Sequence, residues 1–425
     1  MTGLRLALVL AALSLTACSD VPDRTSTPDP APPAQDQPDA PSDSNFPAEP
    51  AAIAPPNTPS EEPGSVSPPD PPDPPTADPV DDAPAVQPDI PPPPPAAGLL
   101  PTDDLVLPPG FIAYRWATDF FQPTVLDFAS DGRLFVAERF GRVWVVWDAD
   151  ADGIAEQRTL FAEGLDEPLT GLLVVDEATV IVSDRTRLLR LEDRDGDGVA
   201  ETTTTILGAL PFGLHHSNGM VLGPDGLLYF TIGSTCNECV ELDPLSATIQ
   251  ALDLESGALQ TVATGLRNPY DLVFTPDGQL WATDNGSDPP CPTPDELNRI
   301  TATRHYGWPY CEPDPRFPNS EPAAFEFALH SSADGIVWLD LPSFPGEWRD
   351  GFYVALFGTG AAGAPQTGKK VQFVQLGADG DLRARDFALG FENPLDISLG
   401  ADGALYIADF GNGTIYRVFP PGRPE

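Results

Sequence analysis

Two adjacent histidines are the side chains of this 425-residue chain that are most suited to moving a proton. His215 and His216 stand just before a Pro-Asp-Gly turn at residues 224–226 and an apolar run at 227–232, which predicts a short buried strand. The pKa of an imidazole lies near neutrality, so a histidine placed beside a strand can act as a general base. The alternative, which residue type alone favours, is a histidine hydrogen-bonded within a loop.

A second candidate group follows about fifty residues later, before the next Pro-Asp-Gly turn at residues 276–278. Arg267 could bind a carboxylate through two guanidinium nitrogens, and Asn268 could hydrogen-bond a quinone or sugar oxygen. A salt bridge between neighbouring repeats is the alternative for Arg267.

Oxygen-rich segments form a third group. Residues 284–288 and 295–298 are rich in carboxylates and amides, and they favour Ca²⁺ over zinc because histidine and cysteine are scarce among them. Two shorter acidic loops alternate aspartates with other residues before a glycine, which also resembles compact calcium loops; they contain Asp148, Asp150, Asp152 and Asp193, Asp195, Asp197. Solvated loops and polar hairpins that bind nothing are the alternatives.

The N-terminus predicts export and lipid anchoring. Residues 1–18 combine Arg5, an apolar stretch and a terminal Cys18, which is typical of a lipoprotein signal peptide; an ordinary secretory signal is the alternative. Residues 19–100 are rich in proline, alanine and aspartate and predict a disordered tether. We therefore expect an extracytoplasmic protein of a bacterial cell envelope, attached to the outer membrane or cell surface only through its lipid.

Charge and cysteine content narrow the partners. The net charge of −42 makes nucleic acid and anionic membrane surfaces poor partners, whereas cations would be attracted. In an exported chain the four cysteines after Cys18 favour disulfides, and we predict Cys236–Cys239 and Cys291–Cys311. A redox or metal-binding role for the Cys-x-x-Cys segment is the alternative.

The fold is predicted by a repeat. A turn followed by a short apolar strand recurs six times, mostly about fifty residues apart, at residues 130–138, 175–184, 224–233, 276–284, 349–358 and 401–409. Short strands at this period are typical of a propeller with one four-stranded blade per copy. We predict an all-β, six-bladed β-propeller over residues 101–425, with its ligand site on one face near the central channel.

Several motifs in this order resemble the glucose/sorbosone dehydrogenase family. They are His216 three residues before Gly219, the Ser-Thr-Cys-Asn-Glu-Cys segment 234–239, the Gly-Leu-Arg-Asn-Pro segment 265–269, and the segments 295–298 and 306–309. The resemblance covers about residues 104–420 and is nearer the sorbosone dehydrogenase-like branch. It implies a six-bladed propeller that oxidises a sugar with pyrroloquinoline quinone and Ca²⁺ and passes electrons to an acceptor in the envelope.

The resemblance also implies roles for single residues. His216 would be the catalytic base, and Arg267 and Asn268 would face the quinone and the reacting carbon. Further expected ligands are Lys370 for the quinone, the carbonyls of Gly286 and Ser287 for the calcium of the cofactor, and Asp295, Glu296 and the carbonyl of Tyr306 for a nearby calcium.

The chain departs from the family pattern at several positions. His215 stands where the family has an aspartate, and Leu169 stands where it has a glutamine. Phenylalanine, glutamate and asparagine at residues 391–393 replace arginines that hold the cofactor carboxylates. Two other functions therefore remain open: a non-catalytic propeller that binds a glycan or protein partner at the cell surface, and a metal-dependent sugar lactonase.

Overall fold

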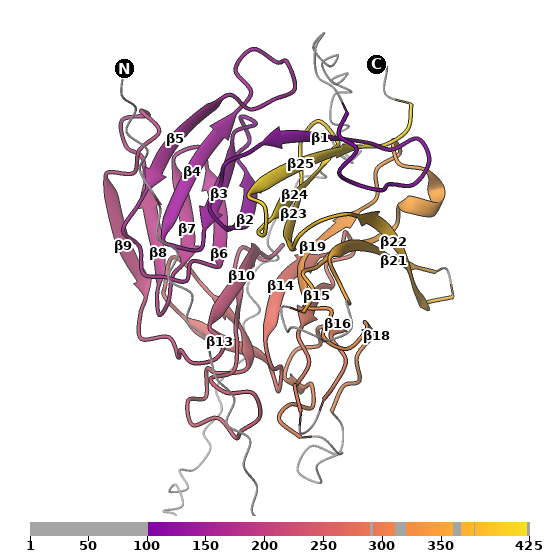
Figure 1. Cartoon of the computed structure of the whole chain (residues 1–425). Coiled ribbons are helices and arrows are strands. Elements are labelled where there is room, and N and C mark those ends of the chain that lie inside the picture. Colours follow the sequence, from indigo (N-terminus) through magenta and orange to yellow (C-terminus); the bar gives the residue numbers. More distant parts are fainter. Residues whose placement is uncertain (1–100, 290–291, 311–319, 360–366, 378, 423–425) are drawn as a thin grey trace, which may run out of the picture. The chain divides into compact units, whose positions relative to one another are not determined.

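Six antiparallel sheets follow one another along the chain and form a ring (Figure 1). The computed structural model describes residues 101–289, 292–310, 320–359, 367–377 and 379–422. The predicted signal peptide with Cys18, the predicted tether and the predicted Cys291–Cys311 bridge lie outside these residues.

Each sheet is one blade, with its innermost strand first in sequence. Blade 1 contains β2 (Pro123–Phe128), β3 (Leu134–Glu138), β4 (Arg142–Trp147) and β5 (Gln157–Ala162). Blade 2 contains β6 (Gly171–Asp176), β7 (Thr179–Ser183), β8 (Leu188–Glu192) and β9 (Thr202–Leu207). Blade 3 contains β10 (Ser217–Leu222), β11 (Leu228–Ile232), β12 (Thr248–Leu252) and β13 (Leu259–Thr264), to which β17 (Arg304–His305) adds in parallel.

The remaining blades follow the same plan. Blade 4 contains β14 (Pro269–Phe274), β15 (Leu280–Asp284), β16 (Glu296–Arg299) and β18 (Phe325–Glu326). Blade 5 contains β19 (Ala333–Leu339), β20 (Gly351–Leu356), β21 (Lys370–Leu376) and β22 (Leu382–Leu389), with a short 3₁₀ helix at Gly346–Trp348. Blade 6 contains β23 (Pro394–Leu399), β24 (Leu405–Asp409) and β25 (Thr414–Phe419).

The ring is closed by a strand from the beginning of the domain. β1 (Ile112–Ala117) pairs antiparallel with β25 and supplies the outermost strand of blade 6. Figure 1 shows this indigo strand beside the yellow end of the chain. The innermost strands also contact one another around the ring, including β2 against β23. The prediction of an all-β, six-bladed propeller is therefore confirmed.

The repeat found in the sequence corresponds to the second strand of each blade. β3, β7, β11, β15, β20 and β24 lie within the six copies, and four of these strands are buried along their whole length. This burial explains why the repeat consists of an apolar run after a polar turn. Among the described residues, no helix is long and apolar enough to cross a membrane.

Three aspartates on innermost strands join one blade to the next. Each accepts a hydrogen bond from a backbone N–H of the following blade: Val174 to Asp127 Oδ2 at 2.7 Å, Ile336 to Asp271 Oδ2 at 3.0 Å, and Leu126 to Asp396 Oδ2 at 2.7 Å. Burial is the main reason that the pKa values of Asp127 and Asp271 rise to about 6, and it also raises the pKa of Asp396. These carboxyls therefore bond across the interfaces between blades at an electrostatic cost.

Two glycines leave room for these carboxyls. A Cβ added to Gly219 would lie 2.3 Å from Oδ1 of Asp271, and one added to Gly335 would lie 2.4 Å from Oδ1 of Asp396. Gly219, three residues after His216, must therefore lack a side chain because Asp271 of the neighbouring blade lies against it.

Replacing Asp271 by asparagine should change how the stability of the fold depends on pH. The folded pKa of about 6 exceeds the unfolded value of 3.8, so Asp271 contributes stability below pH 4 that is lost as the pH rises through 6. Asparagine does not ionise, so the variant should not lose this stability. Between pH 4 and pH 7.5, the free energy of unfolding of wild type should therefore fall by about 1–3 kcal/mol more than that of Asp271→Asn. Urea unfolding at both pH values measures this shift. The exposed Asp103→Asn is the control, and an equal shift in both variants would contradict the prediction.

Candidate functional site

A cavity of about 260 Å³ is lined by residues of all six blades near the channel. Six of these residues occupy one position in the repeat: they are the second residue of the innermost strand in five blades, and the residue just before that strand in blade 2. They are Thr124, Thr170, Asn218, Tyr270, Asp334 and Leu395. The propeller therefore brings equivalent positions, about fifty residues apart in sequence, to one place.

Strand ends supply most of the other lining residues. His216, Asn268 and Ser332 directly precede the innermost strands of blades 3, 4 and 5. Arg139, Asn285, Phe357 and Phe410 directly follow the second strands of blades 1, 4, 5 and 6. His216 and Asn268, two of the predicted catalytic residues, thus lie in the same cavity.

His216 presents an imidazole with an unused nitrogen. Its Nε2 atom is buried and has no hydrogen-bond partner among the described residues. Burial, followed by the charges of Arg139 and Arg185, lowers the pKa of His216 to about 4. The ring is therefore neutral at pH 7 and can accept a proton or a hydrogen bond from a bound ligand.

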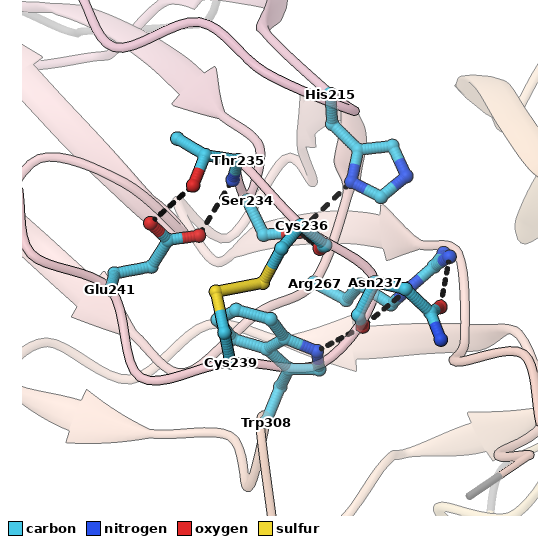
Figure 2. Close-up of a disulfide and its surroundings, with 9 residues drawn as sticks. All are labelled: His215, Ser234, Thr235, Cys236, Asn237, Cys239, Glu241, Arg267 and Trp308. Carbon is cyan, nitrogen blue, oxygen red and sulfur yellow. Dashed lines mark hydrogen bonds between the residues drawn. A yellow bond between two sulfur atoms is a disulfide. The ribbon is translucent and has the colours of Figure 1, made fainter. Parts of the chain in front are cut away.

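His215 is held against the neighbouring loop. Its Nδ1 lies 2.9 Å from Ser234 Oγ, and that hydroxyl donates to the carbonyl of Cys236 at 2.7 Å (Figure 2). Since the hydroxyl hydrogen is used in this way, Nδ1–H of His215 is the donor to Ser234. Burial, then the charge of Arg267, lowers the pKa of His215 to about 3.

The loop beside His215 contains the disulfide Cys236–Cys239, as predicted (Figure 2). Between the two cysteines, the carbonyl of Asn237 accepts hydrogen bonds from Trp308 Nε1 at 3.1 Å and from Arg267 Nε at 3.3 Å. The disulfide loop of blade 3 is thereby tied to residues that flank blade 4.

Arg267 does not line the cavity that holds His216. Its side chain is buried and donates to Asn237 Oδ1 at 2.8 Å and to Asp288 Oδ2 at 3.2 Å. The bond to Asn237 joins Arg267 to the loop of blade 3, whereas Asp288, like Arg267 itself, flanks blade 4. The salt bridge therefore lies within one blade and is not the bridge between neighbouring repeats that the sequence left open as the alternative. Its catalytic role stays a prediction.

Asn268 is positioned by a buried acid and a neighbouring amide. Asp284 accepts the backbone N–H of Asn268 at 2.7 Å and that of Arg267 at 3.0 Å. The side-chain oxygen of Asn268 accepts from Asn218 Nδ2 at 2.9 Å. Because this bond uses the oxygen of Asn268 and fixes the orientation of its amide, the NH₂ group remains as a donor for a ligand.

A second cavity of about 140 Å³ is lined by several of the predicted calcium ligands, namely Gly286, Ser287, Glu296 and Tyr306, together with Arg267 and Asp284. Burial raises the pKa of Glu296 to about 7, and burial followed by the charge of Glu296 raises the pKa of Asp284. A cation would compensate two acids that repel each other here.

Other predicted ligands are placed differently. Asp295 does not line the second cavity; it accepts from the backbone N–H groups of Gly286 at 2.8 Å and Ser332 at 2.7 Å. Lys370 lines neither cavity, and its ammonium lies 2.6 Å from Asp386. Its role toward the quinone stays a prediction.

Both acidic hairpin loops gather their carboxylates. The oxygens of Asp148, Asp150, Asp152 and Glu156 include a set within 4.8 Å of one another, and the same holds for Asp193, Asp195, Asp197 and Glu201. Backbone N–H groups already bond to these acids, including that of Gly153 to Asp148 at 2.7 Å and that of Gly198 to Asp193 at 2.9 Å. Calcium binding at these loops stays a prediction.

Sequence reasoning missed several residues of the main cavity, including Arg139, Asn218 and Asp334, and considered Asn285 only as part of a calcium-binding segment. A signal for them was present in the repeat. Arg139 and Asn285 each follow an acidic residue at the end of an aligned copy, Glu138 and Asp284. Extending the aligned copies by one residue would have placed both on the same face as His216.

Two comparisons of the sequence with known proteins found partial matches. A family model described as a domain of unknown function (DUF7133) matches residues 102–306. Quinoprotein glucose dehydrogenase B of Acinetobacter calcoaceticus is 28% identical over 142 residues, covering 26% of this chain and 29% of that protein. The chain thus aligns with less than a third of the length of this curated relative.

Solved structures match over most of the chain. The pyranose dehydrogenase PQQ domain of Coprinopsis cinerea has a TM-score of 0.64 and 15% identity over 76% of this chain and 98% of that one. The PQQ-bound aldose sugar dehydrogenase of Streptomyces coelicolor has a TM-score of 0.58 and 18% identity over 74% and 99%. At these identities the structures show the fold. With the sequence match to the glucose dehydrogenase, they confirm the predicted resemblance to the pyrroloquinoline quinone glucose/sorbosone dehydrogenase-like family. The branch stays a prediction.

Proposed function

We propose that the chain is a sugar dehydrogenase that uses pyrroloquinoline quinone. The observation that carries this proposal is His216, whose buried Nε2 has no partner among the residues that the structure describes and which lines a cavity with Asn268. Leaving such a group unpaired costs roughly 1–3 kcal/mol, which a ligand that bonds to it would recover. The names of the relatives, a quinoprotein glucose dehydrogenase and PQQ-dependent sugar dehydrogenases, support the same chemistry.

The residues of the main cavity fit a planar, polar cofactor. Phe357 and Phe410 lie edge to face with ring centroids 5.5 Å apart and give the cavity an aromatic wall. Asn285 Oδ1, like His216 Nε2, is buried without a partner among the described residues. Arg139 supplies a cation at the same site, which suits a quinone that carries carboxylates.

In the proposed reaction His216 is the general base. Its neutral imidazole accepts the proton of a sugar hydroxyl, while the NH₂ group of Asn268 holds a sugar oxygen. Pyrroloquinoline quinone, held by Arg139 and the wall of Phe357 and Phe410, would supply the hydride acceptor for the carbon that bears this hydroxyl, so that the sugar would lose one proton and one hydride in total. An anionic ligand beside His216 raises its pKa from about 4 toward the range in which a histidine is an effective base.

Calcium is proposed for the second cavity. Glu296 and the carbonyls of Gly286, Ser287 and Tyr306 would hold the ion, because carboxylates and carbonyls are the ligands that Ca²⁺ prefers. The ion would supply positive charge beside the sugar site and keep Glu296 and Asp284 ionised.

A propeller that binds a glycan or protein without catalysis is the second candidate. The ion pairs of Arg267 with Asp288 and of Lys370 with Asp386 favour it, because the two basic residues predicted to bind the cofactor are engaged with acids. Titration of the full chain with the quinone separates the two candidates.

Replacing His216 by glutamine should remove turnover and keep the cofactor. With the full chain loaded with quinone and Ca²⁺, dye reduction over a panel of aldoses should fall by about 10²- to 10⁴-fold in kcat. The affinity for the quinone, followed by absorbance, should change by less than about threefold, because the side-chain oxygen of glutamine can accept a hydrogen bond in place of Nε2. His330→Gln, which lines neither cavity, is the control. Wild-type turnover in His216→Gln would disprove the role of the base.

Calcium should stabilise the wild-type chain and not Glu296→Gln. At a Ca²⁺ concentration about 100-fold above Kd, one site adds about 2.7 kcal/mol to the free energy of unfolding. Both proteins in this comparison, with and without Glu296→Gln, also carry Asp150→Asn and Asp195→Asn, which weaken calcium binding at the two hairpin loops. Thermal unfolding in Ca²⁺ and in chelator measures the difference. Equal stabilisation of both proteins would contradict calcium binding through Glu296.

We also propose that the chain is exported and anchored through a lipid on Cys18, with the pattern of residues 1–18 as support. Cys18→Ala should move the protein from the membrane fraction to the soluble fraction of the envelope, because a single residue carries the acyl chains. Cell fractionation with an antibody checks this, with Cys239→Ala as the cysteine control. Retention of Cys18→Ala in the membrane would contradict lipid anchoring.

A further inference from the structure

Two arginines occupy the same position in successive blades beside His216. Arg139 follows β3 and the buried Glu138 in blade 1, and Arg185 follows β7 and the buried Asp184 in blade 2. The strand registers of the two blades make these positions equivalent. The ring therefore presents two arginines at one position of the repeat. Arg139 lines the cavity together with Asn285, Phe357 and Phe410, whereas Arg185 does not line it and lies near His216 through Phe212.

Neither guanidinium is neutralised by a residue that the structure describes. Within the described part of the chain, no carboxylate lies within salt-bridge distance of Arg139 or Arg185, although the chain carries 64 acidic residues against 22 basic ones. The two acids next to them in sequence bond elsewhere: Glu138 accepts the N–H of Phe121 at 2.6 Å, and Asp184 pairs with Arg187 at 2.5 Å. The cationic charge is thus available to a ligand.

Aromatic rings and backbone bonds hold the pair in place. The guanidinium of Arg185 lies 4.6 Å from the ring centroid of Phe212, whose ring is 6.0 Å from that of His216. The guanidinium of Arg139 lies 5.6 Å from the ring centroid of Phe140. The backbone of Arg139 is fixed on both sides, because its N–H donates to Gln122 O at 3.0 Å and its carbonyl accepts from Leu169 N at 3.0 Å.

The charge of the whole chain makes this local arrangement significant. A net charge of −42 repels anions at long range, so an anionic ligand that binds here needs nearby cations. Exposed arginines present a planar fork that binds a carboxylate through two hydrogen bonds. Sugars without charge do not require such a pair.

We propose that Arg139 and Arg185 form a carboxylate subsite beside His216. The carboxylate belongs either to the substrate, which is then an acidic sugar of the uronate class, or to the quinone. This identification of the ligand rests on the proposed function, whereas the anion subsite itself does not.

Binding measurements on the full chain test the subsite without relying on turnover. Isothermal titration compares wild type with Arg139→Gln/Arg185→Gln, using three probes: the quinone alone, and glucuronate and glucose, each with the quinone present. Arg139→Lys/Arg185→Lys keeps the charge and should restore part of the affinity. The control is Arg115→Gln/Arg383→Gln, which removes two exposed arginines that each pair with an aspartate elsewhere on the surface.

The outcomes distinguish the two sources of the carboxylate. A quinone affinity reduced at least tenfold in the glutamine variant, and unchanged in the control, assigns the subsite to the cofactor. A glucuronate affinity reduced at least tenfold, with that for glucose unchanged, assigns it to an acidic substrate. Affinities for the quinone and glucuronate that stay within twofold of wild type, or a wild-type chain that binds neither, would overturn the proposal. Binding that follows this pattern without dye reduction by any sugar would refute the proposed dehydrogenase and retain the subsite.

Discussion

The pairing of β1 with β25 joins residues 112–117 to residues 414–419 and makes the ring of six sheets continuous. With that pairing, the last blade gains its outer strand and the innermost strands β2 and β23 come into contact. Asp396 adds a hydrogen bond to Leu126 across the same junction. Because the cavity takes residues from all six blades, its geometry exists only when this junction is closed.

In this ring, the residues that fix the backbone around the site differ from the residues that line its cavity. Acids at the ends of second strands bond to the backbone of the preceding loops, as Asp284 does for Asn268 and Asp409 does for Asn393. These hydrogen bonds fix the backbone positions from which the neighbouring side chains extend. The side chains at the cavity itself then differ from blade to blade, so one position offers arginine, asparagine or phenylalanine. One repeated backbone thus presents several kinds of chemistry on one face.

The sequence predicted the number of blades because the turn and the buried second strand recur at a nearly constant spacing. It also predicted that His216 and Asn268 lie together, since both stand before aligned turns. The partners of Arg267 and Lys370 were not predictable from spacing, because Asp288 and Asp386 reach them through loop and strand neighbours that the repeat does not specify. Arg139 and Arg185 were overlooked because a single arginine at the end of a strand is unremarkable until the ring places two of them beside one imidazole.

β1 has a consequence for the order in which the chain can assemble. It is synthesised about 300 residues before β25, so the first strand of the domain has no pairing partner until the last strand has been made. Joining ends separated by about 300 residues costs on the order of 5 kcal/mol of chain entropy if the intervening segment is flexible, and far less once the five other sheets have formed and brought the ends together. The entropy of closure therefore favours an assembly in which blade 6 is completed last. A chain shortened at its C-terminus would keep five complete sheets and expose β1, an unpaired edge open to a strand from another molecule.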